Sequence, residues 1–546
     1  MRDAFLARDR YEPEYVPTAL SEAKHEAVLR VRHDGFLLTT TYAGPNSVAL
    51  AVRDAASSAG TELRKVEEGT PAWLSGLTLE IEVVGDARPI DFDGDWAAPR
   101  ALDAVIEPGI HGLALAGSTI QHRFCPTEVF TSDVTLSDAL RVIAEKTHAD
   151  PNQLKNTRLF RFRTQHWVQA GSDGAIVALN RGMTPVPPAA VSQRGLDETI
   201  GRIAEYMAYR QRDDGSFSYQ FEPGRDRYTD DDNLVRQAGA IVAMCVDAAS
   251  SGRSASLAAA DAALESHLRN VRDVPRAEGA SFIATPDGQH RLGVTALITL
   301  ALAEHPVPER YAEVRRRLIK GMLSLQRPSG MFVTAFPPAL EIDAQDYYPG
   351  EALLALARQH ALEPTGEVLD AFDRAIDFYR QYFRHRPTPA FVTWQVQAYA
   401  RMADHTKRDD YAAYVFELTD WLAEKQLNRS NCPWPDLWGG IAGYDERNAG
   451  VSTASYLEAF ADALRLARDA GDESRVKRYE ELVRSAARFV LQLQFRPEEA
   501  YFVRSPRDAV GGIRTAPALN LLRIDHCQHA LIALIKTRQV LFPDGR

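Results

Sequence analysis

Hydrophobic positions follow two different periods along this chain. Up to about residue 190, apolar residues often alternate with polar ones, as in the segments 28–32, 77–84 and 159–163. Alternation is the period of a half-buried β-strand. Helical patterns interrupt it around 47–59 and 136–146. The first third of the chain is therefore predicted to be an α+β domain.

From about Leu196 onward the pattern changes to long helical segments at fairly regular intervals. Twelve are predicted, at 195–211, 232–248, 256–271, 291–304, 308–326, 348–360, 366–382, 391–404, 408–426, 452–469, 473–494 and 522–540. Between the two regions, the segment 183–188 has the sequence Met-Thr-Pro-Val-Pro-Pro, and each proline disfavours helix before it. We expect a domain at 1–182, a linker at 183–194 and a helical domain at 195–546.

The predicted helices are of two alternating kinds. The even-numbered ones are small and apolar all round, as in 238–244 and 292–298, which suits burial on both sides, and the odd-numbered ones are amphipathic and carry more charge. Several odd-numbered helices end in a glutamine followed by a turn, at Gln211, Gln326, Gln426 and Gln494. A recurrence near 60 residues or its double indicates a repeat architecture, here an (α/α)6 toroid with an inner and an outer ring.

The connections between these helices are asymmetric. Links from inner to outer helices are short, whereas most links from outer to inner helices are long, at 212–231, 272–290, 327–347, 427–451 and 495–521. Long loops in compact domains are commonly functional. These lead into the inner-helix N-termini, where free backbone N–H groups favour anionic groups. One mouth of the toroid is therefore predicted to hold the functional residues.

Composition and charge narrow the function classes. The 546 residues are 45% apolar and 25% charged, with a mean hydropathy of -0.28, which is typical of globular proteins. The 63 Lys and Arg against 74 Asp and Glu give a net charge of -11, which argues against nucleic acid as a partner. No long apolar run or secretory signal occurs, and the four cysteines are scattered. We expect a soluble cytoplasmic protein with no membrane partner.

The first polar cluster at the predicted mouth runs from Tyr228 to Asp232 and continues to Arg236. Its three adjacent carboxylates repel one another, which can raise a pKa into the range of a general acid. The alternative is that Asp231 or Asp232 caps the following helix.

Two further clusters combine aromatic rings with acids. Tyr347 and Tyr348 precede Glu351, which would lie one turn inside an inner helix as an acid or base, or would only complement the helix dipole. Trp434 and Trp438 share a loop with two glycines, and Tyr444, Asp445, Glu446 and Arg447 follow. This loop suggests a platform for a sugar ring, or else a loop packed on its own aromatics.

The fourth cluster lies before and inside the last helix. Asp525 and His529 are four residues apart and hence on one helix face, and Arg514 or Arg523 could hold a carboxylate. His526 or His529 is a candidate proton carrier. The fifth cluster, His290 and Arg291, is interpreted as a capping or packing pair.

A metal or phosphate cofactor is not predicted. Cys432, His526, Cys527 and His529 match no standard zinc spacing, and no Gly-rich phosphate loop, GxSxG or HExxH motif occurs.

The N-terminal region has a set of segments that resembles a known family. They are 79–83, 86–90, the run Glu107-Pro108-Gly109-Ile110-His111-Gly112-Leu113, and 159–162. Over roughly residues 20–170 they are similar to the AMMECR-type domain of the AmmeMemoRadiSam set. That family carries a cysteine in an LRGCIG motif, where this chain has Phe36-Leu37-Leu38-Thr39-Thr40-Thr41-Tyr42. The resemblance therefore implies a structural or regulatory role without chemistry of that cysteine.

The helical region resembles the six-hairpin toroids of glycosidases, polysaccharide lyases, sugar 2-epimerases and glucuronyl epimerases. The similarity rests on the repeat pattern and on the Trp-Gly-Gly segment at 438–440 and the Arg-Ile-Asp-His segment at 523–526, so no catalytic residue is transferred. Terpene cyclases share the Q-x-x-x-G-x-F turn at Gln326, but 230–232 is not DxDD and the loops are polar. Lanthionine cyclases need zinc ligands that are not seen here.

These observations together favour a carbohydrate-active enzyme acting on a sugar or uronate by acid/base chemistry. The expected ring platform is Tyr347, Tyr348, Trp434 and Trp438. Hydrolysis would use Glu351 with Asp232 or Asp525, at a separation of roughly 5–10 Å. Epimerisation or elimination would use His529 or Tyr348 as base, with Arg514 or Arg523 on a carboxylate. The alternative is a non-catalytic scaffold that binds a ligand or partner.

Overall fold

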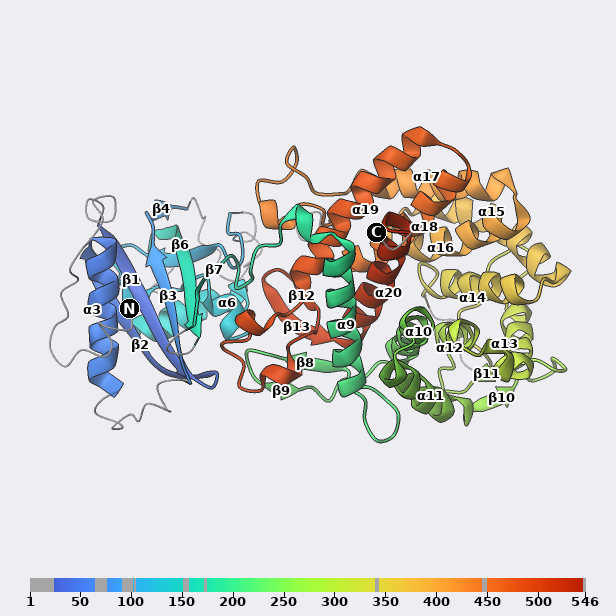
Figure 1. Ribbon diagram of the computed structural model, residues 1–546, viewed down its shortest axis with the longest axis horizontal. Helices are drawn as coiled ribbons and strands as arrows, with labels where there is room; N and C mark the ends of the chain where they lie inside the picture. Colours follow the sequence, from blue (N-terminus) through green and yellow to red (C-terminus); the bar gives the residue numbers. More distant parts are fainter. Residues whose placement is uncertain are drawn as a thin grey trace.

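The computed structural model describes residues 24–63, 76–90, 102, 105–150, 157–170, 174–338, 343–443 and 449–543. A sheet with its helices lies beside a larger ring of helices (Figure 1). Within these ranges no helix has the length and apolar character that crossing a bilayer requires.

The N-terminal region is built on one antiparallel sheet of seven strands. The central order is β2 (Phe36–Asn46), β1 (His25–His33), β3 (Leu77–Val84), β6 (Leu159–Ala170) and β4 (Arg88–Pro89). Two further strands, β5 (His111–Leu115) and β7 (Ile176–Leu179), also pair with β6. The helices are α3 (Val48–Leu63), α6 (Glu128–Thr131) and α7 (Leu136–Thr147).

Both faces of this sheet are covered, which alternation alone did not predict. Leu29 and Val31 pack with α3, as alternation requires. On the other face Arg30 pairs with Glu82 at 2.6 Å, and Arg32 with Glu80 at 3.1 Å, all four side chains being buried. Strand β3 is buried at all eight positions. The polar positions of the alternating pattern are thus filled by buried ion pairs and do not face solvent.

The helical region is a closed double ring, as the sequence predicted. The inner helices are α10 (Leu234–Ser251), α12 (Leu292–Glu304), α14 (Tyr348–Leu362), α16 (Pro389–Thr406), α18 (Ser452–Asp469) and α20 (Ile524–Leu541). The outer helices are α9 (Gln193–Tyr209), α11 (Ser254–Leu268), α13 (Ala312–Ser324), α15 (Gly366–His385), α17 (Asp409–Ala423) and α19 (Glu473–Leu493). Each inner helix packs on the next, and α20 packs on both α10 and α9, which closes the ring (Figure 1).

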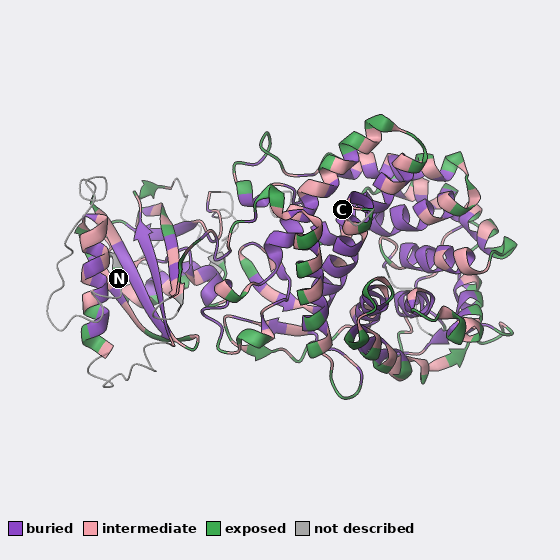
Figure 2. Ribbon diagram, in the orientation of Figure 1, coloured by how far each residue is buried: buried purple, intermediate pink, exposed green. Residues whose placement is uncertain are grey.

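Burial explains why the two rings differ in composition. In α12 every residue from Leu292 to Ala303 is buried, because the helix has the lumen on one side and outer helices on the other. Helix α15 instead buries one stripe and exposes its charged face to solvent. The inner ring is accordingly almost wholly buried (Figure 2).

The recurring glutamines join neighbouring outer helices. The Gln326 side chain donates to Gly330 O in its own turn at 3.2 Å and to Ala371 O of α15 at 2.8 Å. Gln211, Gln426 and Gln494 make the same pair of bonds, and the last reaches Thr199 O of α9, joining the end of the ring to its start.

The glycine in each of these turns is required by close packing. Gly330 has a φ of +92°, and a Cβ there would lie 2.0 Å from Arg374 O of α15. The same holds at Gly439, where a Cβ would meet Ser485 O of α19 at 2.0 Å. The sequence repeat is thus a packing device that brings the turn backbone against the next helix.

Several of the predicted long loops contain short strands. A four-stranded sheet joins β12 (Arg514–Ala516), β13 (Leu519–Arg523), β8 (Gln220–Glu222) and β9 (Arg227–Tyr228). A separate hairpin pairs β10 (Val271–Asp273) with β11 (Ser281–Ile283). Strand β13 runs directly into α20, so the sheet fixes where that inner helix begins.

The proline-rich segment before α9 is pinned to the ring. Thr184 N donates to Glu499 Oε1 at 2.8 Å, and Val186 N donates to Gln492 Oε1 of α19 at 2.8 Å. Gln492 returns a bond to Thr184 O at 2.9 Å. The segment is extended, as its prolines predict, and its backbone is held by side chains of α19 and the loop that follows.

Candidate active site

A cavity of about 540 Å³ opens at the N-terminal ends of the inner helices. All six inner helices or the residues just before them contribute side chains to it. The lining is Asn233, Val235, Arg236, Leu297, Tyr347, Tyr348, Glu351, Pro389, Ala390, Thr393, Trp394, Gly443, Val451, Ser452, Ser455, Tyr456, Arg523, Asp525, His526, Gln528 and His529. Segments far apart in sequence therefore converge because each hairpin delivers the start of its inner helix to the same mouth.

Glu351 lies in the first turn of α14 and is buried. Its Oε2 has no hydrogen-bond partner in the described part of the chain. Burial raises the pKa of this carboxyl from 4.5 to about 8. At neutral pH the group is mainly a neutral acid facing the cavity, which suits a proton donor.

Asp525 is the opposite kind of carboxyl. Arg523 Nη2 lies 2.6 Å from Asp525 Oδ2, and Arg236 Nε lies 3.1 Å from the same oxygen. Burial raises the pKa of Asp525, but His526, Arg523 and Arg236 outweigh it and hold the pKa below its ordinary value. The cavity thus contains one neutral and one ionised carboxyl group.

His529, one turn beyond Asp525 on α20, is oriented by a carboxylate of the neighbouring helix. Its Nδ1 lies 2.7 Å from Oε1 of Glu458, a buried residue of α18. Because the carboxylate of Glu458 accepts this hydrogen bond, Nδ1 is the donor and Nε2 is the ring nitrogen left to accept a proton. This arrangement leaves a base on the cavity wall.

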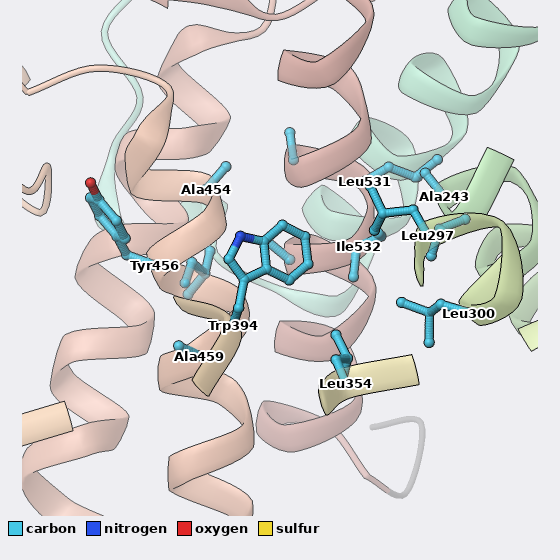
Figure 3. Packing of buried hydrophobic residues seen from close by; sticks show 14 of the residues in the cluster. Ala243, Leu297, Leu300, Leu354, Trp394, Ala454, Tyr456, Ala459, Leu531 and Ile532 are labelled. Atoms are coloured by element: carbon cyan, nitrogen blue, oxygen red, sulfur yellow. The ribbon is translucent and has the colours of Figure 1, made fainter. Parts of the chain in front are cut away.

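Aromatic rings form much of the remaining wall. Trp394 of α16 lies 5.8 Å from the ring of His529, and Tyr348 and Tyr456 flank the same space. The Trp394 indole projects into the lumen among residues of several inner helices (Figure 3). Burial raises the pKa of both Tyr348 and Tyr456 to about 12, so both stay neutral and supply apolar faces with a hydroxyl.

Glycines on the inner helices make room for these side chains. A Cβ on Gly293 of α12 would lie 2.5 Å from Glu351 Oε2 and 2.6 Å from Cδ1 of Tyr348. A Cβ on Gly350 of α14 would meet Trp394 Cβ at 2.5 Å. The small residues that predicted an inner ring therefore also shape the cavity.

A second chamber of about 230 Å³ lies further along the lumen. It shares Leu297, Trp394 and Gln528 with the first cavity, so these three side chains separate the two spaces. Glu458 lines the second chamber and His529 the first. Their hydrogen bond therefore links the two.

The structure brings seven of the predicted site residues into the first cavity: Arg236, Tyr347, Tyr348, Glu351, Arg523, Asp525 and His529. Their chemical roles remain proposals, treated below. The other five predicted residues lie elsewhere.

The two tryptophans of the predicted platform do not line the cavity. Trp434 lies against the N-terminal domain, with its ring 5.8 Å from that of His111 and 4.9 Å from the Arg163 guanidinium carbon. Trp438 donates from Nε1 to Cys432 O at 2.8 Å within its own loop. The prediction of a sugar platform at this loop is therefore wrong, and the alternative of a loop packed on its own aromatics fits only Trp438.

Asp232, Tyr228 and Arg514 are also outside the cavity. Asp232 is exposed, and its Oδ1 accepts from Asn233 N and from the Gln237 side chain at 2.8 Å. Tyr228 bonds Asp508. Arg514 is buried in an ion pair of 2.8 Å with Glu499 near the domain junction. Each has a structural partner that holds it away from the mouth.

Two residues or pairs that the sequence offered as helix caps can now be compared with the structure. Asn233, not Asp231 or Asp232, caps α10, accepting from Val235 N at 3.1 Å and Arg236 N at 3.2 Å. His290 Nδ1 accepts from Thr285 N at 3.1 Å, which agrees with a packing role for that pair.

The structure shows no metal cluster in the ranges that it describes, where no group of three His, Cys, Asp or Glu side chains could hold an ion. Cys432 lies in the Trp434 loop, whereas His526, Cys527 and His529 lie on α20. Tyr444, Asp445, Glu446 and Arg447 fall outside the described residues.

Trp394, Tyr456 and Glu458 are among the residues of this site that sequence reasoning missed. All three lie inside apolar stretches of inner helices, where the pattern predicts burial and gives no sign of a site. A glutamate in the run Tyr-Leu-Glu-Ala-Phe at 456–460 was the available signal, because a buried acid needs a partner.

No protein-family model matches the chain, and no curated protein matches it. The resemblance of the N-terminal region to the AMMECR-type domain therefore stays a prediction.

Solved structures of other proteins align with this chain at low identity and with low TM-scores. A GH76 α-mannanase from Bacteroides thetaiotaomicron is 10% identical, with a TM-score of 0.47, over 66% of this chain and 100% of that one. An unsaturated glucuronyl hydrolase specific for heparin is 9% identical, with a TM-score of 0.46, over 64% and 98%. A type II terpene cyclase from Scytonema is 13% identical, with a TM-score of 0.41, over 64% and 99%. Scores this low carry no argument about activity.

Proposed function

We propose that the helical ring is a carbohydrate-active enzyme that acts on a sugar or uronate by acid/base chemistry. The observation that carries this proposal is the pairing in one cavity of a buried neutral acid, Glu351, with a carboxylate-oriented base, His529. Perturbed ionisable groups that converge in a deep pocket are typical of catalytic sites.

The two groups have complementary roles in proton transfer. Glu351 holds a proton that it can donate, and His529 Nε2 can accept one while Glu458 stabilises the resulting imidazolium. Hydrolysis and elimination both donate a proton to the leaving oxygen of the sugar, whereas epimerisation returns a proton to carbon. Each route also needs a base, which takes a proton from a water in hydrolysis and from a carbon in the other two. A hydrolytic route would add Asp525 as the second carboxyl group.

The cavity wall suits a polyhydroxylated ring. Tyr347, Tyr348, Trp394 and Tyr456 offer apolar faces for its C–H surface, and Ser452, Ser455 and Thr393 offer hydroxyl partners.

Charge at one end of the cavity favours an acidic sugar. Arg236 and Arg523 together carry two positive charges against one negative charge on Asp525, leaving one positive charge unmatched. A uronate carboxylate placed there would accept from the free guanidinium N–H groups.

Thermal shift against neutral and uronate oligosaccharides tests substrate binding. A ligand at one hundred times its dissociation constant adds about 2.7 kcal/mol to stability. We expect uronates to stabilise the protein more than neutral sugars, and Arg523→Gln to abolish the difference.

Turnover of the best ligand then tests catalysis. We expect Glu351→Gln and His529→Asn each to lower kcat by about 10²–10⁴-fold. The exposed residues Glu367 and His385 supply the matched controls, Glu367→Gln and His385→Asn, which should leave kcat unchanged. Ligand binding without turnover in the wild-type protein would instead support a non-catalytic binding scaffold.

A further inference from the structure

A cavity of about 200 Å³ lies between the N-terminal domain and the ring, away from the proposed active site. The domain contributes Arg163, His166 and Arg181, and the ring contributes Trp434 and Asp436 from the loop before α18. Because both regions supply wall, the cavity exists only while they are docked.

Trp434 makes the main contacts of the ring with the N-terminal domain at this cavity. The guanidinium carbons of Arg163 and Arg181 lie 4.9 and 5.6 Å from its ring centroid. Arg181 also pairs through Nε with Asp436 at 2.6 Å and through Nη1 with Glu107 at 2.6 Å. The loop of the ring is therefore anchored on cations of the domain.

Three polar groups on the wall have unused hydrogen-bonding capacity. Arg181 is 4% exposed and its Nη2 has no hydrogen-bond partner, and the buried ring of His166 has none at Nδ1, while its Nε2 lies 3.4 Å from Glu80 Oε1. Arg163 donates from Nε to His111 Nε2 at 3.3 Å and pairs with no carboxylate in the described ranges. Buried polar groups are normally satisfied, so those of His166 and Arg181 require a partner.

The unused N–H groups of the wall indicate what that partner is. Burial lowers the pKa of the neighbouring His111 to about 4, and the positive charges of Arg161, Arg163 and Arg181 act in the same direction. Asp436 and Glu107 both pair with Arg181, so together with Arg163 these four groups are neutral. The N–H groups that the two arginines leave unused favour a ligand with strong acceptor atoms, and an oxyanion supplies them.

We propose that this interdomain cavity binds a small oxyanion, the carboxylate or phosphate group of a molecule of a few carbon atoms. Arg163 and Arg181 Nη2 supply guanidinium N–H donors on the wall of this space, the pattern that recognises such groups. The volume excludes an oligosaccharide, so this ligand differs from the proposed substrate.

An occupied site would also bear on the active site. Trp434 and Asp436 belong to the segment that continues to Gly443, which lines the catalytic cavity. An anion bridging Arg163 and Arg181 fastens one end of that segment to the domain. Through this loop, anion binding at the N-terminal domain would regulate the cavity of the ring.

Titration calorimetry on the full-length protein tests this site with sodium acetate and, separately, inorganic phosphate, at constant ionic strength. We expect saturable binding of at least one, which identifies the oxyanion, and a loss of about tenfold or more in affinity in Arg163→Gln. Arg158→Gln is the matched control, because Arg158 is an exposed arginine that also lies over a ring, Phe160, but does not line the cavity. Glu351→Gln should bind as the wild type does.

Hydrogen exchange on the wild-type protein gives a readout that needs no variant. Amides around 434–436 should exchange more slowly when the anion is bound, because it rests against that loop. No saturable binding of either anion, equal affinity in Arg163→Gln and wild type, or unchanged exchange at 434–436 would each overturn the proposal.

Discussion

Replacing Glu351 by glutamine should change how the stability of the ring depends on pH. The folded protein holds the Glu351 proton up to about pH 8, because burial raises the pKa of this carboxyl, and the ordinary value is 4.5. Between these two values the folded state binds more protons than the unfolded chain. The stability that this bound proton contributes is therefore fully present below about pH 4.5, and it is lost as pH rises through about 8.

The size of this loss follows from the two pKa values. The interval from 4.5 to about 8 corresponds to about 5 kcal/mol, at about 1.4 kcal/mol for each pH unit. Glutamine keeps the shape of the neutral acid and does not ionise. The free energy of unfolding of Glu351→Gln minus that of wild type should rise by about 5 kcal/mol across the interval.

Thermal unfolding followed by circular dichroism of the helices measures this difference. For a unit of roughly 350 residues, 1 kcal/mol corresponds to about 1.3 °C. From pH ~5 to pH ~8 the difference amounts to about 4 kcal/mol, so the gap in Tm should widen by about 5 °C. Glu367→Gln, an exposed change, should run parallel to wild type. A gap between Glu351→Gln and wild type that does not vary with pH would refute a buried neutral acid at this position.

Three further predictions concern packing, chemistry and the domain junction. Gly330→Ala should destabilise the ring by at least about 2 kcal/mol, because the φ is +92° and the new Cβ would lie 2.0 Å from a backbone carbonyl oxygen. Gly366→Ala, where a Cβ would meet nothing within 4 Å, should change stability by less than about 0.5 kcal/mol. Thermal unfolding measures both variants. His529→Asn should lower kcat by about 10²–10⁴-fold with KM little changed, as steady-state kinetics would show. Trp394→Ala should weaken binding of a sugar ligand by about tenfold in calorimetry, whereas Trp434→Ala should leave that affinity within about twofold, because only Trp394 lines the cavity.

Each of these has an outcome that contradicts it. Equal Tm values for the two glycine variants would show that the turn backbone does not approach the next helix closely. A His529→Asn protein with unimpaired kcat would remove the imidazole from the chemistry. Weaker sugar binding in Trp434→Ala than in Trp394→Ala would restore the platform at the loop.

The sequence by itself determined the architecture of this protein. Periodicity fixed the two regions and the twelve helices, because a helix buried on all sides must be apolar all round and an outer helix only along a stripe. The long loops before the inner helices correctly placed Tyr348, Glu351, Asp525 and His529 at one mouth. Those residues follow from chain order alone, since every inner helix begins at the same end of a closed ring.

Only the tertiary structure decided which polar residues meet. Trp434 sits in a loop that sequence placed at the mouth, but cations of the N-terminal domain hold it at the junction. Glu458 looked like a core position until its contact with His529 across two helices gave it a role. Such pairings join residues far apart in sequence, and local pattern carries no information about which neighbour a side chain will reach once the helices pack.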